Sequence, residues 1–402
     1  MNAKKIINDP IYGLVSFPFE ELYVLIDNPW FQRLRRISQM GLTNYVYPGA
    51  NHSRFSHALG ALHLMTKAID TLRSKGVDVT NEEYLATCQA ILLHDIGHGP
   101  FSHGLEQLLY NKHHEEISLD IMYLLKDEGL VLPMAIKIFK SEYHKTFLSQ
   151  LVSSQLDMDR MDYLTRDSYY SGVAEGVIGY SRLISMMNVR DNNLVIEEKA
   201  IFSIEKFLVA RHFMYWQVYL HKTSVKSERM LKELVQRIKL LIRENKFQEK
   251  DWTDLTRFLK DVQDGIINDT NYLKTFATLD DIDVMANVKL LVNHPDFIVS
   301  YLSKSILHRR LFALEMQNSP FKSDQILNTR LKVAGHLKIS KDFATGLVYA
   351  GNESTQAYNN YKEDIRVLKK DGKVYPLSEV LNSWINVKKV TKFYLCYPRI
   401  ND

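Results

Sequence analysis

Cysteine is scarce in this sequence: its 402 residues contain only Cys88 and Cys396, and no CxxC pair occurs. A disulfide scaffold and a thiolate zinc site are therefore not expected. No apolar run reaches the length of about 18 residues that a transmembrane helix needs, and the start MNAKKIINDPIYG lacks the apolar segment of a signal peptide. We therefore expect a cytoplasmic protein that does not enter a membrane.

An excess of charge of one sign is also missing. The 51 Lys and Arg residues nearly balance the 47 Asp and Glu residues, which leaves a net charge of +4. This balance favours a mildly basic enzyme over a nucleic-acid-binding protein. Internal repeats and low-complexity tracts are absent as well. Any phosphate binding must therefore come from local clusters, and nucleic acid is not indicated as a partner.

Helical periodicity dominates the first 250 residues. Apolar side chains at spacings of three and four predict amphipathic helices, and no alternating segment of useful length competes with them. Proline and glycine before residue 30 predict a small hairpin or loop ahead of the first helix. The expected helices span 30–40, 54–73, 82–95, 114–127, 154–169, 203–222 and 225–244.

The C-terminal part has a different pattern. Residues 251–316 still have helical periodicity, but beyond Gly335 short runs such as LKIS, GLVYAG and KFYLCYP carry β-branched and aromatic residues. The run DIRVLKKDGKVYPL contains Asp371-Gly372 and predicts a β-hairpin. We expect a mainly α protein with a helical bundle over 1–250 and a smaller α+β region over 251–402, which we predict to make oligomer contacts.

Histidine and aspartate concentrate in four segments. His94 and Asp95 end an apolar helix, and an imidazole beside a carboxylate suits a divalent ion such as Mn, Fe, Zn or Mg. A His-Asp pair alone is usually a surface feature. Here, His57 and a later aspartate would complete four ligands and leave positions open for water and substrate. The segments are HSRFSHALG (52–60), LLHDIGHGPFSHGLE (92–106), KHHEE (112–116) and LDMDRMDYLTRD (156–167).

Spacing alone leaves the later carboxylate open. Asp157 and Asp159 lie two residues apart, so on a helix they point in nearly opposite directions and only one can face the metal. The face of Asp159 carries acid, phenol and base together, which is typical of a site lining. Asp157 and Asp162 could instead be solvated or pair with nearby arginines. The residues that share this face are Asp159, Tyr163, Arg166 and Asp167.

Arginines stand where phosphates would need them. Arg54 lies one helical turn before His57, Arg160 follows Asp159, and Arg211 begins the aromatic run RHFMYWQVYLHK. Guanidinium groups bind phosphate in a bidentate manner. Each of these arginines could equally form a surface salt bridge, so the argument rests on their grouping.

These segments together resemble the HD-domain phosphohydrolases, and within them the deoxynucleoside triphosphate triphosphohydrolases related to the SAM-and-HD-domain protein. The resemblance covers roughly residues 4–225 and includes no SAM domain. It implies an HD-type catalytic domain over 1–250, with a regulatory or interface segment at 1–40. The segments that carry it are KIINDPIYG (5–13), NPWFQRLRRISQMG (28–41), YPGANHSRFSHALG (47–60), LLHDIGHGPFSH (92–103), DMDRMDYLTRDSYYSG (157–172) and YLHK (219–222).

The resemblance also implies an activity and assigns roles. The implied reaction converts a dNTP and water into a deoxynucleoside and triphosphate with a divalent ion, which could be Mn, Mg, Fe, Zn or Ni. The implied metal ligands are His57, His94, Asp95 and Asp159, and the implied catalytic group is His103, His114 and Glu106. Implied phosphate contacts are Arg54, His98, Arg160 and Arg211. Implied deoxyribose contacts are Gln39, Met40, Tyr163, Asp167 and Tyr219.

Regulation and assembly are implied in the same way. An activating nucleotide would bind at a subunit interface through Lys5, Asn8, Asp27, Gln32 and Arg35, although FQRLRR could be only a solvated basic helix. A homo-oligomer, a dimer or a tetramer built as a dimer of dimers, is expected.

Departures from the family pattern leave some questions open. Glu106 stands where the family has Asp, and Tyr215 and Leu220 replace His and Gln near the nucleoside, so base preference stays open. Two alternatives remain. One is another HD hydrolase, such as a nucleoside monophosphatase or a cyclic-nucleotide phosphodiesterase, and the other is a non-enzymatic nucleotide sensor.

Overall fold

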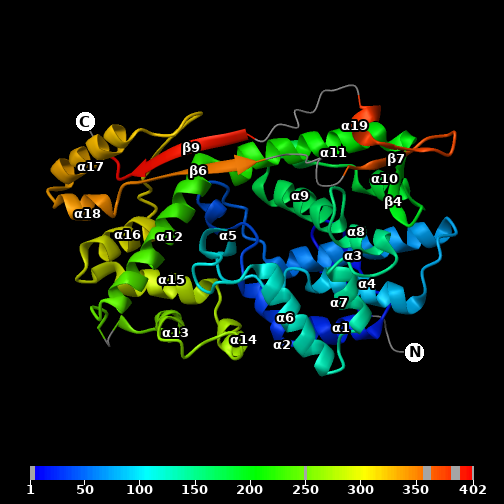
Figure 1. Ribbon diagram of the computed structural model, residues 1–402, viewed down its shortest axis with the longest axis horizontal. Coiled ribbons are helices and arrows are strands. Elements are labelled where there is room, and N and C mark those ends of the chain that lie inside the picture. The colour runs from blue at the N-terminus through cyan, green and yellow to red at the C-terminus, as the bar shows by residue number, and fades with distance from the viewer. Residues whose placement is uncertain (1–4, 249–250, 356–363, 382–389, 401–402) are drawn as a thin grey trace.

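A computed structural model describes residues 5–248, 251–355, 364–381 and 390–400, apart from the side chains of His103 and Thr355. Helices make up most of it, with small sheets at the N-terminus, beside α10 and α11, and in the C-terminal part (Figure 1). The expectation of a mainly α protein with a C-terminal α+β portion is therefore confirmed.

The N-terminal segment forms the small hairpin that its prolines and glycines predict. Strands β1 and β2 pair antiparallel, and Gly13 takes the positive φ of 72° that the turn requires. The helix expected over 30–40 is shorter than predicted, because it ends in a 3-10 turn. The elements are β1 (Ile7–Asp9), β2 (Gly13–Val15), α1 (Glu20–Asp27), α2 (Pro29–Gln32), η1 (Arg33–Arg36) and η2 (Gly41–Tyr45).

The helices that carry the histidine-rich segments begin at clear caps. The Ser53 side chain accepts the Ser56 N–H at the start of α3, Thr80 and Glu83 form a capping box for α4, and Asp157 accepts the Arg160 N–H at the start of α9. These helices are α3 (Arg54–Ser74), α4 (Asn81–Leu93), α5 (Ser102–Leu105), α6 (His114–Asp127), α7 (Pro133–Phe139), α8 (Thr146–Val152) and α9 (Met158–Ser171).

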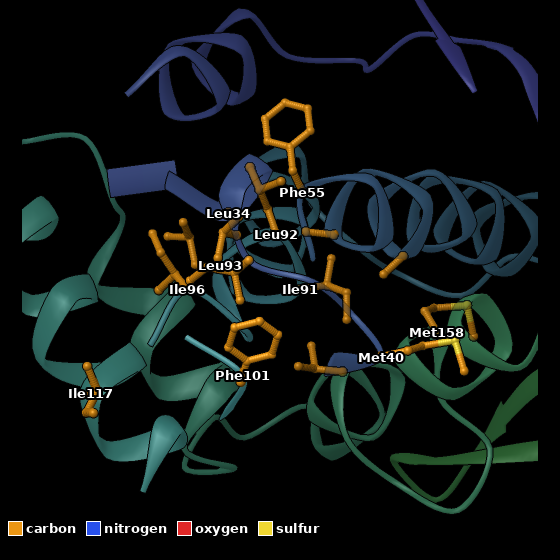
Figure 2. Packing of buried hydrophobic residues seen from close by; sticks show 14 of the residues in the cluster. Leu34, Met40, Phe55, Ile91, Leu92, Leu93, Ile96, Phe101, Ile117 and Met158 are labelled. Carbon is orange, nitrogen blue, oxygen red and sulfur yellow. The ribbon is translucent and has the colours of Figure 1, made fainter. Parts of the chain in front are cut away.

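Helix α3 packs against both α4 and α9 at the centre of one core. The α4 side chains Ile91, Leu92 and Leu93 are fully buried, and Figure 2 shows them among apolar residues from other segments, including Leu34 and Phe101. Burial of such side chains provides about 1.5–3 kcal/mol each. This packing fixes the relative positions of the helices that carry His57, His94 and Asp159.

The segment after α9 contains a hairpin that the sequence reasoning missed. Strands β3 and β4 pair antiparallel across Asp191 and Asn192, whose φ values of 49° and 62° are typical of a tight type I′ turn. The aromatic run then forms a π-helical stretch, which is often found at functional sites. The elements are η3 (Ala174–Gly176), α10 (Tyr180–Ser185), β3 (Met187–Arg190), β4 (Asn193–Glu197), η4 (Glu198–Ala200), α11 (Ile201–Met214), η5 (Tyr215–Tyr219) and α12 (Lys222–Arg243).

The C-terminal part begins with helices and ends with strands. They are α13 (Asp254–Gln263), α14 (Tyr272–Phe276), α15 (Asp281–Leu290), η7 (Leu291–Asn293), α16 (Phe297–Leu307), β5 (Ala313–Gln317), α17 (Ser323–Leu337), α18 (Lys341–Thr345), β6 (Tyr349–Thr355), β7 (Arg366–Leu368), β8 (Val374–Pro376), α19 (Leu377–Val380) and β9 (Val390–Tyr397). The run LKIS is not a strand, because Lys338 takes a left-handed conformation that ends α17.

Two sheets organise the C-terminal strands. One has the order β5-β9-β6, and β9 and β6 run along the upper edge of the molecule in Figure 1. The other has the order β3-β4-β7-β8 and contains the predicted hairpin around Gly372 as β7 and β8. Because β4 pairs in parallel with β7, hydrogen bonds cross the expected boundary at residue 250. The division into two domains at that residue stays a prediction.

Candidate active site

Helices α3, α4 and α9 bring two imidazoles and a carboxylate to one point. Nε2 of His57 lies 3.1 Å from Oδ1 of Asp159, and Nε2 of His94 lies 3.4 Å from the same oxygen. Both imidazole nitrogens are buried, and neither forms a well-oriented hydrogen bond with a described residue. Two buried lone pairs that face one carboxylate can hold a metal ion.

The opposite nitrogen of each imidazole is fixed by a hydrogen bond. Nδ1 of His57 lies 2.8 Å from Oδ2 of Asp162, and Nδ1 of His94 lies 2.6 Å from the carbonyl oxygen of Ile91. When Nδ1 carries the proton and donates it, Nε2 is left as a lone pair toward Asp159. Metal-binding histidines in proteins are oriented in this way, so the residues present fit a divalent ion.

Asp95 borders the same point and has its own partner. Its Oδ1 lies 3.3 Å from Nε2 of His94, and its Oδ2 lies 3.8 Å from Nε2 of His57. Arg54 holds Oδ2 through Nη1 at 2.5 Å and reaches Oγ of Ser102 through Nη2 at 3.1 Å. Arg54, expected to contact phosphate, is thus also a partner of an expected metal ligand. These four side chains, His57, His94, Asp95 and Asp159, are called the ligand group below.

The electrostatics of the ligand group favour a positive charge. Burial opposes protonation of His57, but Asp159 and Asp162 outweigh it and raise its pKa to about 10. Although burial disfavours its charged form, the pKa of Asp159 lies far below its ordinary range because His57 and His94 face it. A divalent cation can supply the positive charge that this arrangement favours.

The structure distinguishes Asp159 from Asp157. Asp157 is buried at the start of α9, where Oδ1 accepts the Arg160 N–H at 2.7 Å and Oδ2 accepts the Ser154 N–H at 2.7 Å. Burial raises the pKa of Asp157 to about 6. This carboxylate caps a helix and is not solvated, so Asp159 is the one of the two that faces the imidazoles.

A second group lies next to the first and shares Asp95. Nε2 of His98 lies 3.3 Å from Oδ1 of Asp95, and the His98 ring stacks on the ring of His114 with centroids 3.9 Å apart. Oε1 of Glu106 lies 2.6 Å from Nδ1 of His114, and this hydrogen bond lowers the pKa of Glu106 to about 2. Glu106 is therefore a carboxylate that can orient and charge-stabilise His114. The side chain of His103 lies outside the described residues.

The residues expected to contact deoxyribose fall into two environments. Oη of Tyr219 donates to Oδ2 of Asp167 at 2.6 Å, and the rings of Tyr163 and Tyr219 pack 6.3 Å apart. Gln39 is buried and its Oε1 has no partner among the described residues. Met40 is buried too, but its side chain belongs to the apolar core, where Figure 2 labels it.

The two remaining arginines lie between α9 and α11. Arg160 donates from Nε to the Ser154 carbonyl oxygen at 2.6 Å and pairs with Asp157 at 3.2 Å. Arg211 donates from Nη1 to Oε1 of Gln155 at 3.3 Å, and its buried Nε has no partner among the described residues. Both guanidinium groups therefore keep donors that an anion can use.

The residues expected to bind an activating nucleotide are brought together. Lys5, Asn8, Asp27 and Arg35 line one cavity of about 250 Å³ between the β1–β2 hairpin, α1 and α3. Gln32 holds Arg35 by accepting its Nε–H at 2.8 Å. Lys5 and Asp27 form an exposed ion pair within the lining, and Arg35 lies over the Phe55 ring at 3.7 Å. We call this space the N-terminal cavity.

Comparisons with known proteins identify the family of this chain. The HD domain family matches residues 54–167, and the HD associated region matches 178–270. A solved phosphohydrolase from Bacteroides thetaiotaomicron is 44% identical with a TM-score of 0.92, covering 99% of this chain and 100% of that one. The uncharacterized protein MG461 of Mycoplasma genitalium is 30% identical over 92% of each chain.

The chain belongs to the HD-domain phosphohydrolases. It is also similar to the deoxynucleoside triphosphate triphosphohydrolase SAMHD1 homolog of Dictyostelium discoideum, at 34% identity over 57% of this chain and 48% of that protein. No helix among the described residues of this HD-domain protein is long and apolar enough to cross a bilayer.

Three side chains at this HD-domain site were missed by the sequence reasoning. Asp162 was considered only as solvated or paired with an arginine, yet it also fixes His57. His52 lies 2.7 Å from Oδ1 of Asp167 through Nε2. Asp281 accepts the Phe101 N–H and the Ser38 N–H, each at 2.8 Å. Asp162 lies one helical turn after Asp159, which is a usable signal, whereas Asp281 is too distant in sequence to be found.

Proposed function

We propose that this HD-domain phosphohydrolase converts deoxynucleoside triphosphates and water into deoxynucleosides and triphosphate, in a reaction that requires a divalent ion. One observation carries the proposal: the ligand group converges on α3, α4 and α9, and Asp167 and Tyr163 lie further along the same helix, α9. The similarity to a named triphosphohydrolase over 57% of this chain supports the choice of substrate.

The proposed chemistry assigns a task to each group. A divalent ion held by His57, His94, Asp95 and Asp159 would polarise the α-phosphate and lower the pKa of a bound water. His114, held by the charged Glu106, is placed to exchange a proton with the reacting groups. The stacked His98 is kept neutral, because burial and the nearby Arg54 lower its pKa, so it can hydrogen-bond without adding charge.

Binding of the substrate would use the groups that surround the ligand group. Arg160 and Arg211 offer donors for the triphosphate, whose charge a single ion cannot balance. Asp167 and Tyr219, hydrogen-bonded to each other, would face the sugar, where the Tyr219 ring leaves little room for a 2′-hydroxyl. Gln39 would use its unpartnered amide oxygen for a sugar hydroxyl, and contacts from His103 and Met40 stay predictions.

Regulation and assembly belong to the same proposal. A second nucleotide would bind in the N-terminal cavity, where Lys5 and Arg35 provide positive charge and Asp27 accepts hydrogen bonds from a base edge. The protein would act as a homo-oligomer in the cytoplasm, with the C-terminal region at the contacts. The cavity lies on the molecular surface beside α1, which is compatible with completion of the site by another subunit.

Product analysis tests the proposal. Metal-stripped protein is supplied with Mn²⁺ or Mg²⁺ and each dNTP, alone and in pairs, and the phosphate products are separated by anion exchange. We expect equal amounts of deoxynucleoside and triphosphate, with faster turnover in some pairs. Release of inorganic phosphate alone would overturn the triphosphohydrolase assignment. Asp95→Ala should be inactive, whereas Asp296→Asn, at the start of α16 and paired with Arg237 rather than with the ligand group, serves as the matched control.

A further inference from the structure

A line of charged side chains joins the N-terminal cavity to a residue of the ligand group. Asp9 lines the cavity, and its Oδ2 accepts a hydrogen bond from Nη1 of Arg166 at 2.9 Å. Arg166 also donates to both oxygens of Asp162, from Nε at 2.8 Å and from Nη2 at 3.0 Å. Oδ2 of Asp162 is the partner of His57 Nδ1 at 2.8 Å. We call Asp9, Arg166 and Asp162 the relay.

The relay is buried almost completely. The side chains of Arg166 and Asp162 are 0% exposed, that of Asp9 is 7% exposed, and that of His57 is 1% exposed. Charges interact strongly where water is excluded. A buried ion pair adds little net stability, but loss of one partner costs about 3–5 kcal/mol because the other charge stays buried. If one member of the relay is displaced, the buried charge of its neighbour loses its partner, which favours a displacement of that neighbour as well.

Helix α3 has a glycine where it meets the relay. A Cβ on Gly60 would lie 1.9 Å from Oδ1 of Asp162 and 2.2 Å from Nη2 of Arg166. Gly60 lines the N-terminal cavity as well. A helix-interior glycine costs about 0.5–1 kcal/mol relative to alanine, so the close approach comes at a cost in helix stability. Gly60 is thus part of the cavity lining and is also in close contact with the relay.

Asp9 also controls the backbone of the cavity. Its Oδ1 accepts the N–H groups of Ile11 and Tyr12 at 2.9 and 3.0 Å, which fixes the turn between β1 and β2. Strand β1 carries Asn8, another residue of the cavity lining. A ligand that shifts β1 therefore also shifts the Asp9 carboxylate, which holds Arg166.

We propose that Asp9 and Arg166 are positioning residues that couple occupancy of the N-terminal cavity by a nucleoside triphosphate to the orientation of His57 and so to the affinity for the divalent ion. This inference rests on the proposed function, since it takes the cavity as a nucleotide site and His57 as a ligand. Coupling between two binding sites is reciprocal. The ion must therefore change the affinity for the cavity nucleotide by the same factor by which the nucleotide changes the affinity for the ion.

The test measures Mn²⁺ binding rather than turnover. Free Mn²⁺ is followed by electron paramagnetic resonance in the metal-stripped full chain, with and without an α,β-imido dNTP analogue. Asp9→Asn keeps the side-chain shape and removes the charge that faces Arg166, and Lys5→Ala shows how much of the effect comes from nucleotide bound elsewhere. In the unchanged chain we expect the analogue to lower the Kd for Mn²⁺ several-fold. The ratio of the Kd for Mn²⁺ without the analogue to the Kd with it measures the coupling. In Asp9→Asn this ratio should fall to its value in Lys5→Ala.

Controls keep the outcomes distinct. Asp296→Asn removes a carboxylate from the Arg237 ion pair, at 2.5 Å between α12 and α16, and should keep the full ratio. If Asp9→Asn does not fold, Arg166→Lys keeps the charge but loses the two-pronged contact with Asp162, and should lower the ratio in the same direction. The ¹⁵N shift of His57 Nδ1 should change on nucleotide addition only where the relay is intact.

Failure of this inference differs from failure of the proposed function. A full ratio in Asp9→Asn, or no effect of the analogue on Mn²⁺ binding in the unchanged chain, overturns the coupling. A second outcome is that the unchanged chain shows the coupling, Asp9→Asn lacks it, and no dNTP yields triphosphate. In that case the coupling through the relay is supported, and only the substrate assignment is wrong.

Discussion

The ligand group and the N-terminal cavity share one stretch of α3, yet they are built in opposite ways. His57 is 1% exposed and is held from behind by Asp162, so its position is fixed before any ion binds. In the lining of the cavity, Lys5 and Asp27 form their ion pair with 54% and 62% of their side chains exposed. Buried, paired groups make a rigid site. Exposed groups can give up their ion pair and bind a ligand instead at a small cost in free energy.

The largest effect is expected from the ligand group itself. Asp159→Asn removes the charge that both imidazoles face, so several kcal/mol of transition-state stabilisation should disappear and kcat should fall by about 10³-fold or more. Triphosphate release and Mn²⁺ affinity are measured together. Unchanged Mn²⁺ affinity would show that the ion is held elsewhere, and circular dichroism verifies that the variant is folded.

A smaller effect is expected from Glu106, the hydrogen-bond partner of His114. Glu106→Gln keeps a hydrogen-bond acceptor but removes the charge, and the weakened proton transfer should lower kcat by about 10²-fold. The Kd for Mn²⁺ should stay close to that of the unchanged chain. A variant with full kcat would remove Glu106 and His114 from the chemistry.

Glu106 also predicts a pH dependence of stability. Its pKa in the folded chain, about 2, lies below its ordinary value of 4.5, so between these values the unfolded chain binds more protons. The stabilisation is therefore complete above about pH 5 and is lost as pH falls through 4.5 towards 2. Urea titrations at pH 6 and pH 3 should show a smaller loss in Glu106→Gln than in the unchanged chain. Equal losses would contradict the prediction.

An intermediate effect is expected from Asp281, which holds the loop before α5 from α15. Asp281→Asn leaves one of two backbone N–H groups, of Ser38 or Phe101, without an acceptor, at a cost of about 1–3 kcal/mol in unfolding free energy. Phe101 has a φ of 43°, so its conformation needs this support. We expect kcat/KM to fall by roughly tenfold through misplacement of the nearby histidines. A loss of stability with full kcat/KM would limit Asp281 to a structural role.

The smallest effect on stability is expected at the cavity. Asp27→Asn breaks an exposed ion pair and should change the unfolding free energy by less than about 1 kcal/mol. Asp162→Asn breaks a buried pair and should cost about 3–5 kcal/mol. Urea denaturation of the two variants side by side measures the contrast. Similar losses would mean that the cavity is as rigid as the ligand group, and Asp27→Asn should in addition weaken activation by a second nucleotide.

Local patterns were enough to find most helices. The spacing of apolar residues predicted 114–127, which is α6 to the residue, and the glycine of the Asp371-Gly372 turn placed the β7–β8 hairpin. The β3–β4 hairpin was missed, because its strands of 4 and 5 residues are too short to stand out from the helical periodicity around them. Helix α9 begins at Met158, because Asp157 caps it.

The sequence by itself determined the chemistry available to this protein. Imidazoles and carboxylates as the available donors favour a divalent ion, and a periodicity near 3.6 residues predicts a helical bundle. Only the tertiary structure decided what stands behind those groups. Asp9 and Arg166 meet across 157 residues of chain, and β4 joins β7 across the expected domain boundary. Such contacts depend on how helices and strands pack in three dimensions, and the local spacing of residues does not predict them.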